Sequence, residues 1–294
     1  MKQRIYYLDV VRCFACLLVV LMHAPYPNSG LSGLVVVPIS LATAPCIGLF
    51  FMVSGALLLP TEDNGIDFMK KRLSKVLIPL LVWTVVGIVM NGLANGFGSP
   101  QQMIQKICSI PFSTQGHGVL WFMYVLIGLY LITPIISPWL ERCSRKELKM
   151  YLLLWLVTMT FPYLKMVLTV NDSITGSFYY LSGYVGYFLL GYYLRKYGCG
   201  KTWVALLWLP VPFVLLGISK AKGVPFELNS HFWYLSLPTA ISAWSWLTII
   251  KNLESKIVSW SPKVLNMIAK FSCLSFGIYL MHIFIMRNGL WPIF

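Results

Sequence analysis

The sequence has few charged residues for its length, and acidic residues are especially scarce. Charged residues make up 11% of the 294 residues, with 9 acidic residues against 23 Lys and Arg, whereas 58% of the chain is hydrophobic. A soluble domain needs a more polar surface than this composition provides. Long apolar runs are present and short alternating strands are not, which favours helices over a membrane barrel. The composition therefore predicts an all-α, polytopic transmembrane helical bundle.

The sequence also lacks a small-residue cleavage site after its first apolar segment, so we expect this segment to stay in the membrane as a helix. Neither an internal repeat nor a low-complexity tract is evident. Residues 1–294 are therefore expected to form a single membrane-embedded domain with short loops, the longest at about 93–118. Because the chain stops directly after its last apolar run, we expect it to be truncated at the C-terminus relative to longer relatives.

About nine apolar runs are long enough to cross a bilayer. Pro45 is expected to kink the second run, and Pro210 with Pro212 the seventh. With the N-terminus placed in the cytoplasm, most of the 23 Lys and Arg residues fall on the cytoplasmic side, as the positive-inside rule requires. The formal charge of +14 thus indicates orientation and contact with anionic lipid, and nucleic-acid binding is not expected. The runs lie at about 7–25, 34–59, 74–92, 119–139, 149–168, 178–195, 202–219, 232–250 and 267–291.

The seven cysteines are scattered and show no metal-ligand spacing with His, Asp or Glu, so we predict no metal site. Cys13 and Cys16 form a C-x-x-C pattern inside an apolar helix, without the βαβ context of redox proteins. Packing as small apolar residues is therefore the expected role of both.

Two ionisable residues, Arg12 and His23, lie in the first apolar segment. A charge at membrane depth costs roughly 2.5–3.5 kcal/mol on insertion scales, so it commonly serves a function. Eleven helical steps of about 100° bring His23 to within about 20° of Arg12, roughly 16 Å along the axis. One helix face is thus predicted to carry a fixed cation near one membrane surface and a titratable base near the other.

Each of these two residues has a structural alternative. Arg12 either anchors a phosphate or carboxylate, or forms an ion pair with Asp9 at a favourable helical spacing. A histidine side chain suits proton transfer from a hydroxyl near neutral pH, yet His23 is equally explained as an interfacial histidine hydrated by water.

Four further residues are weaker candidates on spacing alone. Ser54 precedes Gly55 in the second run, where close helix packing is the better interpretation because no nucleophile elbow surrounds the serine. Arg72 and Lys75 lie one turn apart at the start of the third run, a spacing that suits phosphate contacts. Trp121 begins the fourth run and is typical of a membrane-interface aromatic residue.

The remaining histidines differ in depth. His117 precedes the fourth run, and His231 is expected to be interfacial. His282 lies within the last run, where it either bonds across to another helix or takes part in a site.

Five sequence elements occur in a fixed order on successive runs, which is far more specific than the spacing of Arg12 and His23 alone. With them the chain resembles, over nearly its whole length, the acyltransferase 3 family of membrane O-acyltransferases, which commonly modify bacterial surface glycans. Members usually have ten spans. The elements are R-x10-H at Arg12 to His23, FFMVSG at Phe50–Gly55, RLSKVLIP at Arg72–Pro79, LWFMYVLIGLYLITP at Leu120–Pro134 and SFGIYLMH at Ser275–His282.

The resemblance implies transfer of acetyl from cytoplasmic acetyl-CoA to a sugar hydroxyl, with no permanently bound cofactor. It implies that Arg12 and His23 are essential. It also implies phosphate contacts at Arg72 and Lys75, although Lys75 stands where the family usually has arginine and lacks the bidentate fork. Substrate contacts are expected at Ser54, Trp121 and His282.

The resemblance also bears on partners and location. The opening, the length and the late WPI are most similar to the branch of the family that acetylates the enterobacterial common antigen. We therefore expect acetyl-CoA, a surface or lipid-linked glycan and membrane lipid as partners, in a bacterial inner membrane. Because Gly118 and Val119 separate His117 from Leu-Trp-Phe, the role of a histidine that directly precedes this motif in the family is not carried over.

Two other function classes remain open. A transporter or flippase for a polar or acyl solute explains Arg12 and His23 equally well, but it explains the ordered motifs less well and the missing repeat counts against it. A non-catalytic membrane scaffold fits only if the chain end is native and inactivating.

Overall fold

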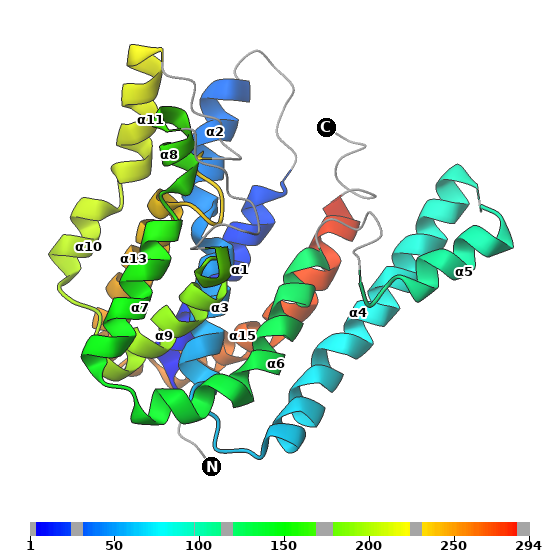
Figure 1. Cartoon of the computed structure of the whole chain (residues 1–294), viewed down its shortest axis with the longest axis horizontal. Helices are drawn as coiled ribbons and strands as arrows, with labels where there is room; N and C mark the ends of the chain where they lie inside the picture. The colour runs from blue at the N-terminus through cyan, green and yellow to red at the C-terminus, as the bar shows by residue number, and fades with distance from the viewer. Residues whose placement is uncertain are drawn as a thin grey trace. The chain divides into compact units, whose positions relative to one another are not determined.

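The computed structural model describes residues 4–24, 32–96, 98–112, 120–168, 179–223 and 231–286. Over these ranges the regular secondary structure is helical, which confirms the all-α class (Figure 1). The count of nine spans and the cytoplasmic N-terminus stay predictions. Within the described residues, five stretches are long and apolar enough to cross a membrane: Val35–Leu58, Gly65–Met90, Trp121–Arg142, Thr202–Lys222 and Pro262–Ile285.

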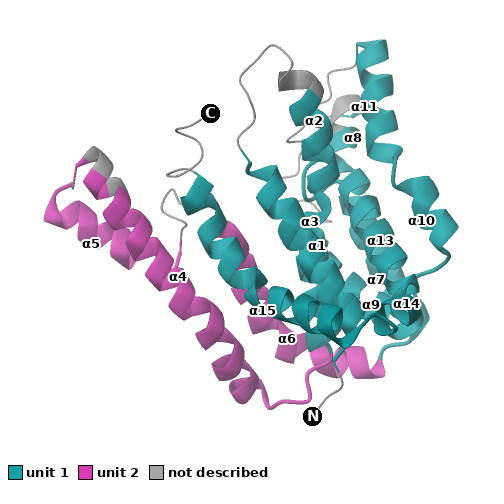
Figure 2. Cartoon of the chain, turned by 180° about the vertical axis from the view of Figure 1, so that it is seen from behind, with its two compact units in different colours: residues 1–59, 143–294 teal, residues 60–142 magenta. Residues whose placement is uncertain are grey.

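The chain separates into two compact units, residues 1–59 with 143–294 and residues 60–142, which Figure 2 colours separately. We describe each unit by itself, and a single domain over residues 1–294 stays a prediction. The smaller unit contains α4 (Gly65–Asn95), α5 (Pro100–Cys108) and α6 (Trp121–Arg142). The larger unit contains α1 (Tyr6–Met22), α2 (Ser32–Thr43), α3 (Pro45–Leu58), α7 (Arg145–Thr158), α8 (Phe161–Val167), the 3-10 turn η2 (Tyr179–Leu181), α9 (Val185–Tyr197), α10 (Thr202–Trp208), α11 (Val211–Lys222), α13 (Leu237–Asn252), α14 (Glu254–Val258) and α15 (Pro262–Ile285).

Proline divides two of the predicted spans, as expected from the sequence. Pro45 is the first residue of α3, directly after α2 has ended at Thr43. Pro210 and Pro212 lie where α10 gives way to α11. Proline lacks a backbone N–H and clashes with the preceding turn, so it interrupts a helix but is well placed at the start of the next one.

The predicted long loop at 93–118 was wrong in part, because residues 100–108 form α5. Ser99 and Gln102 make a reciprocal capping box, and Pro100 occupies the first turn. Four of its nine residues are Gln or Lys, so a search for long apolar runs interprets it as a loop, whereas its capping residues predict its start.

In the larger unit, α1 packs against α15 on one side and α3 on another, and α3 in turn packs against α9. The α3–α9 contact brings two backbones together at glycines. A Cβ added at Gly55 would lie 1.8 Å from the carbonyl oxygen of Phe188, and one added at Gly191 would lie 1.9 Å from that of Met52. Close packing at Gly55, predicted from the Ser54–Gly55 pair, is therefore confirmed.

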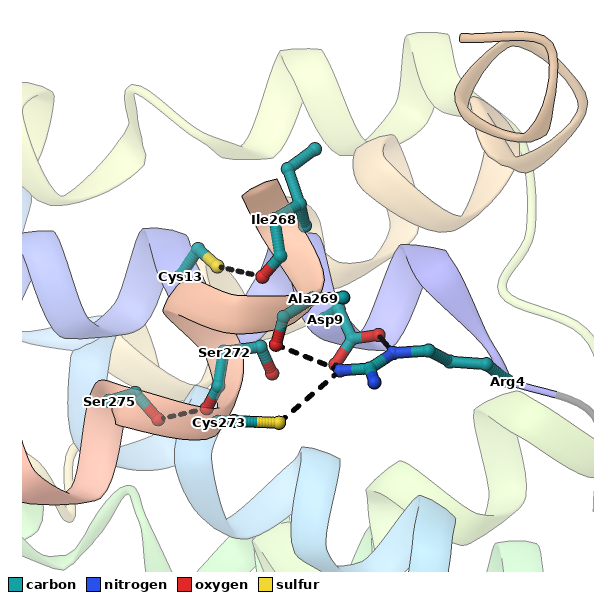
Figure 3. Close-up of polar contacts among 8 residues, drawn as sticks. All are labelled: Arg4, Asp9, Cys13, Ile268, Ala269, Ser272, Cys273 and Ser275. Carbon is teal, nitrogen blue, oxygen red and sulfur yellow. Dashed lines mark hydrogen bonds and ion pairs between the residues drawn. The ribbon is translucent and has the colours of Figure 1, made fainter. Parts of the chain in front are cut away.

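One end of the α1–α15 contact is held by Arg4 (Figure 3). Its Nε donates to Asp9 Oδ2 at 2.6 Å, and one terminal nitrogen donates to Asp9 Oδ1 at 3.2 Å and to the backbone oxygen of Ala269 at 2.9 Å. The hydrogen bond to Asp9 raises the pKa of the Arg4 guanidinium above its usual value. This arginine therefore joins the start of α1 to α15 as a permanent cation.

The two cysteines of the C-x-x-C pattern also face α15. The Cys13 thiol donates to the backbone oxygen of Ile268 at 3.5 Å, and the Cys16 thiol donates to that of Ser275 at 3.8 Å (the first pair is drawn in Figure 3). Thiols are weak donors, so these contacts indicate a packing role for both cysteines.

Candidate functional site

The face of α1 that carries Arg12 points into the larger unit. Leu8, Cys16 and Val19 lie one or two turns from Arg12 on that face, and all three are buried. Leu21, about 180° around the helix from Arg12, is 45% exposed. The exposed side of α1 is thus opposite to the side that carries the arginine.

Arg12 does not form the ion pair with Asp9 that was one of its two predicted roles. Both oxygens of Asp9 accept hydrogen bonds from Arg4, so the carboxylate is already bound by a guanidinium fork. Arg12 makes no hydrogen bond or ion pair with any residue in the part of the chain that the structure describes. A half-buried guanidinium without an anion among the described residues is suited to bind an anionic ligand.

His23 is the residue at which α1 ends. Its backbone N–H donates to Val20 O at 3.3 Å, and its ring nitrogen Nδ1 lies 2.9 Å from the backbone oxygen of Val19. The side chain is half-buried, so it is neither in the packed core nor fully exposed.

His282 on α15 meets His23. Its Nε2 lies 3.3 Å from His23 Nδ1, and the two ring centroids are 4.9 Å apart at an interplanar angle of 63°. Its other nitrogen, Nδ1, lies 2.5 Å from the backbone oxygen of Tyr279, and the side chain is only 5% exposed. His282 thus bonds across to another helix, as one of its two predicted roles required, and the residue it reaches is the candidate base.

Tyrosines surround this end of α1. The Tyr279 ring centroid lies 5.8 Å from that of His282, and the Tyr234 hydroxyl lies 3.1 Å from Met22 Sδ. Tyr187 donates to the backbone oxygen of Tyr234 at 2.6 Å and so fixes the segment that carries it. The sequence interpretation missed these tyrosines. Tyr279 was accessible to it, because a residue three before His282 shares its helix face.

Ser54 uses its hydroxyl within its own helix. The Oγ donates to the backbone oxygen of Phe50 at 2.9 Å, a bond that serines in apolar helices commonly make. A substrate contact for Ser54 stays a prediction.

The predicted phosphate contacts lie in the smaller unit. The Arg72 guanidinium carbon lies 5.9 Å from the centre of the Phe68 ring, and its Nε is buried without a hydrogen-bond partner among the described residues. Lys75 is exposed. The neighbouring Lys71 pairs with Asp63 at 3.5 Å, so it behaves as an ordinary positive flank.

The other candidates are placed as follows. Trp121 is the first residue of α6. Its ring is edge-on to that of Phe122, and the two ring centroids are 6.5 Å apart. His117 lies outside the described residues. His231, expected at an interface, is 6% exposed and lies 5.6 Å from the Tyr163 ring. No group of three or more His, Cys, Asp or Glu side chains in the described ranges could hold a metal ion.

Comparison with known proteins decides the family. Residues 5–291 match the model of an acyltransferase domain. The chain belongs to the acyltransferase 3 family. It is also 23% identical, over 313 residues, to a Bacillus subtilis (strain 168) protein named "Putative membrane-bound acyltransferase YfiQ", with 95% of this chain and 80% of that protein covered. No solved structure matches.

Membership of the acyltransferase 3 family confirms the resemblance that the five ordered motifs carried. With its long apolar helices, the protein is a membrane acyltransferase. The donor, the acceptor and the residues that perform the reaction go beyond the family match and are taken up as proposals.

Proposed function

We propose that this acyltransferase is an integral membrane O-acetyltransferase that moves acetyl from acetyl-CoA to a hydroxyl of a surface polysaccharide or lipid-linked glycan. One observation carries the proposal. Among the described residues Arg12 has no anionic partner, although it lies on the buried side of the helix that is followed directly by His23. An anion-binding group and a base on one helix are what transfer between a phosphorylated donor and a hydroxyl requires.

The proposed chemistry needs no bound cofactor. His23 takes the proton of the acceptor hydroxyl while the hydroxyl oxygen attacks the thioester carbonyl carbon. The carbon–sulfur bond then breaks, CoA leaves as its thiolate, and the proton passes from His23 to that thiolate. The products are a glycan acetyl ester and free CoA.

The two basic positions have separate proposed tasks. Arg12 holds an anionic part of the donor, since its guanidinium stays charged at any accessible pH. Arg72 and Lys75 contact the CoA phosphates, as the family resemblance implies, and the unsatisfied Nε of Arg72 is compatible with this task.

The acceptor is the least constrained part of the proposal. The opening motif and the late WPI favour the enterobacterial common antigen or a similar lipid-linked glycan, and hence a bacterial inner membrane. Ser54 and Trp121 are proposed substrate contacts, and His282, whose Nε2 lies 3.3 Å from Nδ1 of His23, is proposed to act on the substrate through that residue.

The test is acetyl transfer by the purified full-length protein in detergent, with labelled acetyl-CoA and lipid-linked glycan. We expect His23→Ala to reduce transfer by about 10²–10⁴-fold, the usual contribution of general base catalysis. Lys222→Ala, an exposed position at the end of α11, is the control and should leave transfer unchanged.

Undiminished transfer by folded His23→Ala protein would overturn the proposed role of His23. No acetyl transfer by the wild-type protein, together with solute movement across reconstituted vesicles, would support a transporter instead. In detergent there are no compartments between which a solute could move, so acetyl transfer measured there reports enzymatic activity alone.

A further inference from the structure

We propose that His282 is a positioning residue that, together with the backbone oxygen of Val19, holds the hydrogen of His23 on Nδ1 and so leaves Nε2 as the base. In this arrangement His23 donates from Nδ1–H to Nε2 of His282, so the lone pair of His23 lies on its Nε2. The catalytic meaning of this inference rests on the proposed function, but the assignment of the hydrogens does not.

The protonation of His282 follows from its partner on α15. Its Nδ1 lies 2.5 Å from the backbone oxygen of Tyr279, and a carbonyl oxygen can only accept a hydrogen bond. Nδ1 must therefore carry a hydrogen. A neutral imidazole has only one N–H, so Nε2 of His282 is an acceptor.

The same reasoning gives the tautomer of His23. Its Nδ1 lies 2.9 Å from the backbone oxygen of Val19 and 3.3 Å from Nε2 of His282, and both of these atoms are acceptors. A lone pair on Nδ1 would face two other lone pairs, whereas one hydrogen satisfies both as a three-centre bond. The neutral ring then has its basic nitrogen at Nε2.

The register of α1 and α15 makes this contact a property of the fold. Cys16 contacts Ser275 and His23 contacts His282, and each pair is separated by the same 259 positions in sequence. The two helices thus run parallel, and the second pair repeats the first about two turns later. With Arg4 bound to Ala269 at the other end, sliding of one helix along the other would break all three contacts.

The arrangement has a consequence for proton transfer. When His23 gains a proton at Nε2, its Nδ1–H becomes a donor with positive charge, and hydrogen bonds from charged donors are about twice as strong as neutral ones. His282 therefore favours the protonated form of His23 in the step where the acceptor hydroxyl loses its hydrogen. A group that orients a catalytic histidine through its second nitrogen is a general device of such sites.

The direct test is ¹⁵N NMR of the full-length protein in detergent with ¹⁵N-labelled histidine. The chain has four histidines, so single variants can assign the signals. We expect an unprotonated Nε2 and a protonated Nδ1 for His23 in the wild-type protein. In His282→Leu one of the two acceptors of this hydrogen is lost while Val19 remains, and we expect a larger share of the other tautomer than in the wild-type protein. His282→Gln provides an amide oxygen at similar reach and should restore the wild-type pattern.

Kinetics supply the second readout. We expect His282→Leu to lower kcat by about 10–100-fold, less than loss of the base itself because Val19 still accepts from Nδ1. KM for acetyl-CoA should not change, and His282→Gln should recover most of kcat. His231→Gln, at a buried histidine outside this contact, is the matched control and should alter neither the His23 signal nor kcat.

Two results would overturn the positioning role: a protonated Nε2 on His23 in the wild-type protein, or an unchanged tautomer and kcat in His282→Leu. If His282→Leu does not fold, the wild-type spectrum and His282→Gln decide. The predicted tautomer without acetyl transfer would contradict the proposed function alone. Acetyl transfer with the opposite tautomer would contradict this inference alone.

Discussion

The two ends of the α1–α15 contact differ in how they treat charge. At one end Arg4 binds both oxygens of Asp9 and a backbone oxygen of α15, so its donors are largely satisfied. Farther along, on α1, Arg12 has no protein anion among the described residues, and the contact ends where Nε2 of His282 lies 3.3 Å from Nδ1 of His23. The first end holds the helices together, whereas we propose that the second presents a cation and a base to the substrates. Arg4, whose donors are largely satisfied, is thus structural, and Arg12 is the candidate ligand contact.

The sharpest way to break this comparison is Arg12→Ala. Because Arg12 makes no hydrogen bond or ion pair within the described ranges, we expect the melting temperature in detergent to stay within about 2 °C of wild type. We expect kcat/KM to fall about 10–100-fold, as for the loss of one charged hydrogen bond to a substrate. Transfer assays and a thermal melt on the same preparation measure both. Arg12→Lys keeps the charge and should lie in between, since lysine lacks the fork. A large drop in melting temperature with normal kinetics would show that Arg12 is structural.

The reciprocal change is Arg4→Ala. It leaves the Asp9 carboxylate largely buried without its partner, so we expect a loss of about 1–2 kcal/mol in unfolding free energy, discounted because the Arg4 side chain is 41% exposed. Activity per folded molecule should change by less than about twofold. Chemical denaturation in detergent measures the loss, and Asp9→Asn with Arg4→Ala completes a double-mutant cycle. Additive effects in that cycle would mean that the pair does not stabilise the helix contact.

The smallest effect is expected for Lys71→Ala in the smaller unit. Its ion pair with Asp63 is long at 3.5 Å, and the two side chains are 58% and 43% exposed. Exposed pairs of this kind contribute about 0–1 kcal/mol, so stability and transfer should both stay near wild type. Arg72→Ala in the same helix, by contrast, should weaken acetyl-CoA binding. If Lys71→Ala and Arg72→Ala bind acetyl-CoA with the same affinity, Arg72 is not a phosphate contact.

Local chemistry made much of the fold predictable. The breaks at Pro45 and Pro210 follow from the missing N–H of proline, and the helical class follows from long apolar runs. The capping residues Ser99 and Gln102 predict the start of α5 from the local sequence alone, but a search that looks only for long apolar runs misses this helix. The family was predictable as well, because five motifs kept their order along the chain.

The contacts within the site were less predictable. Helical spacing allows Asp9 to meet Arg12, but it cannot show that Arg4, which precedes the helix, reaches the carboxylate first. The contact between His23 and His282 joins residues 259 positions apart, so it depends on how α1 and α15 pack. Spacing indicated which residues are candidates for the chemistry, and packing decided which protein atoms they contact.

The seam between α3 and α9 limits how this enzyme can move. At Gly55 and Gly191 the two backbones approach so closely that no side chain fits between them, and shifting either helix by one residue would bring a bulkier neighbour into the gap. These two helices should therefore travel as one rigid body during turnover. Any gate that admits a substrate or releases a product therefore has to open along another helix boundary.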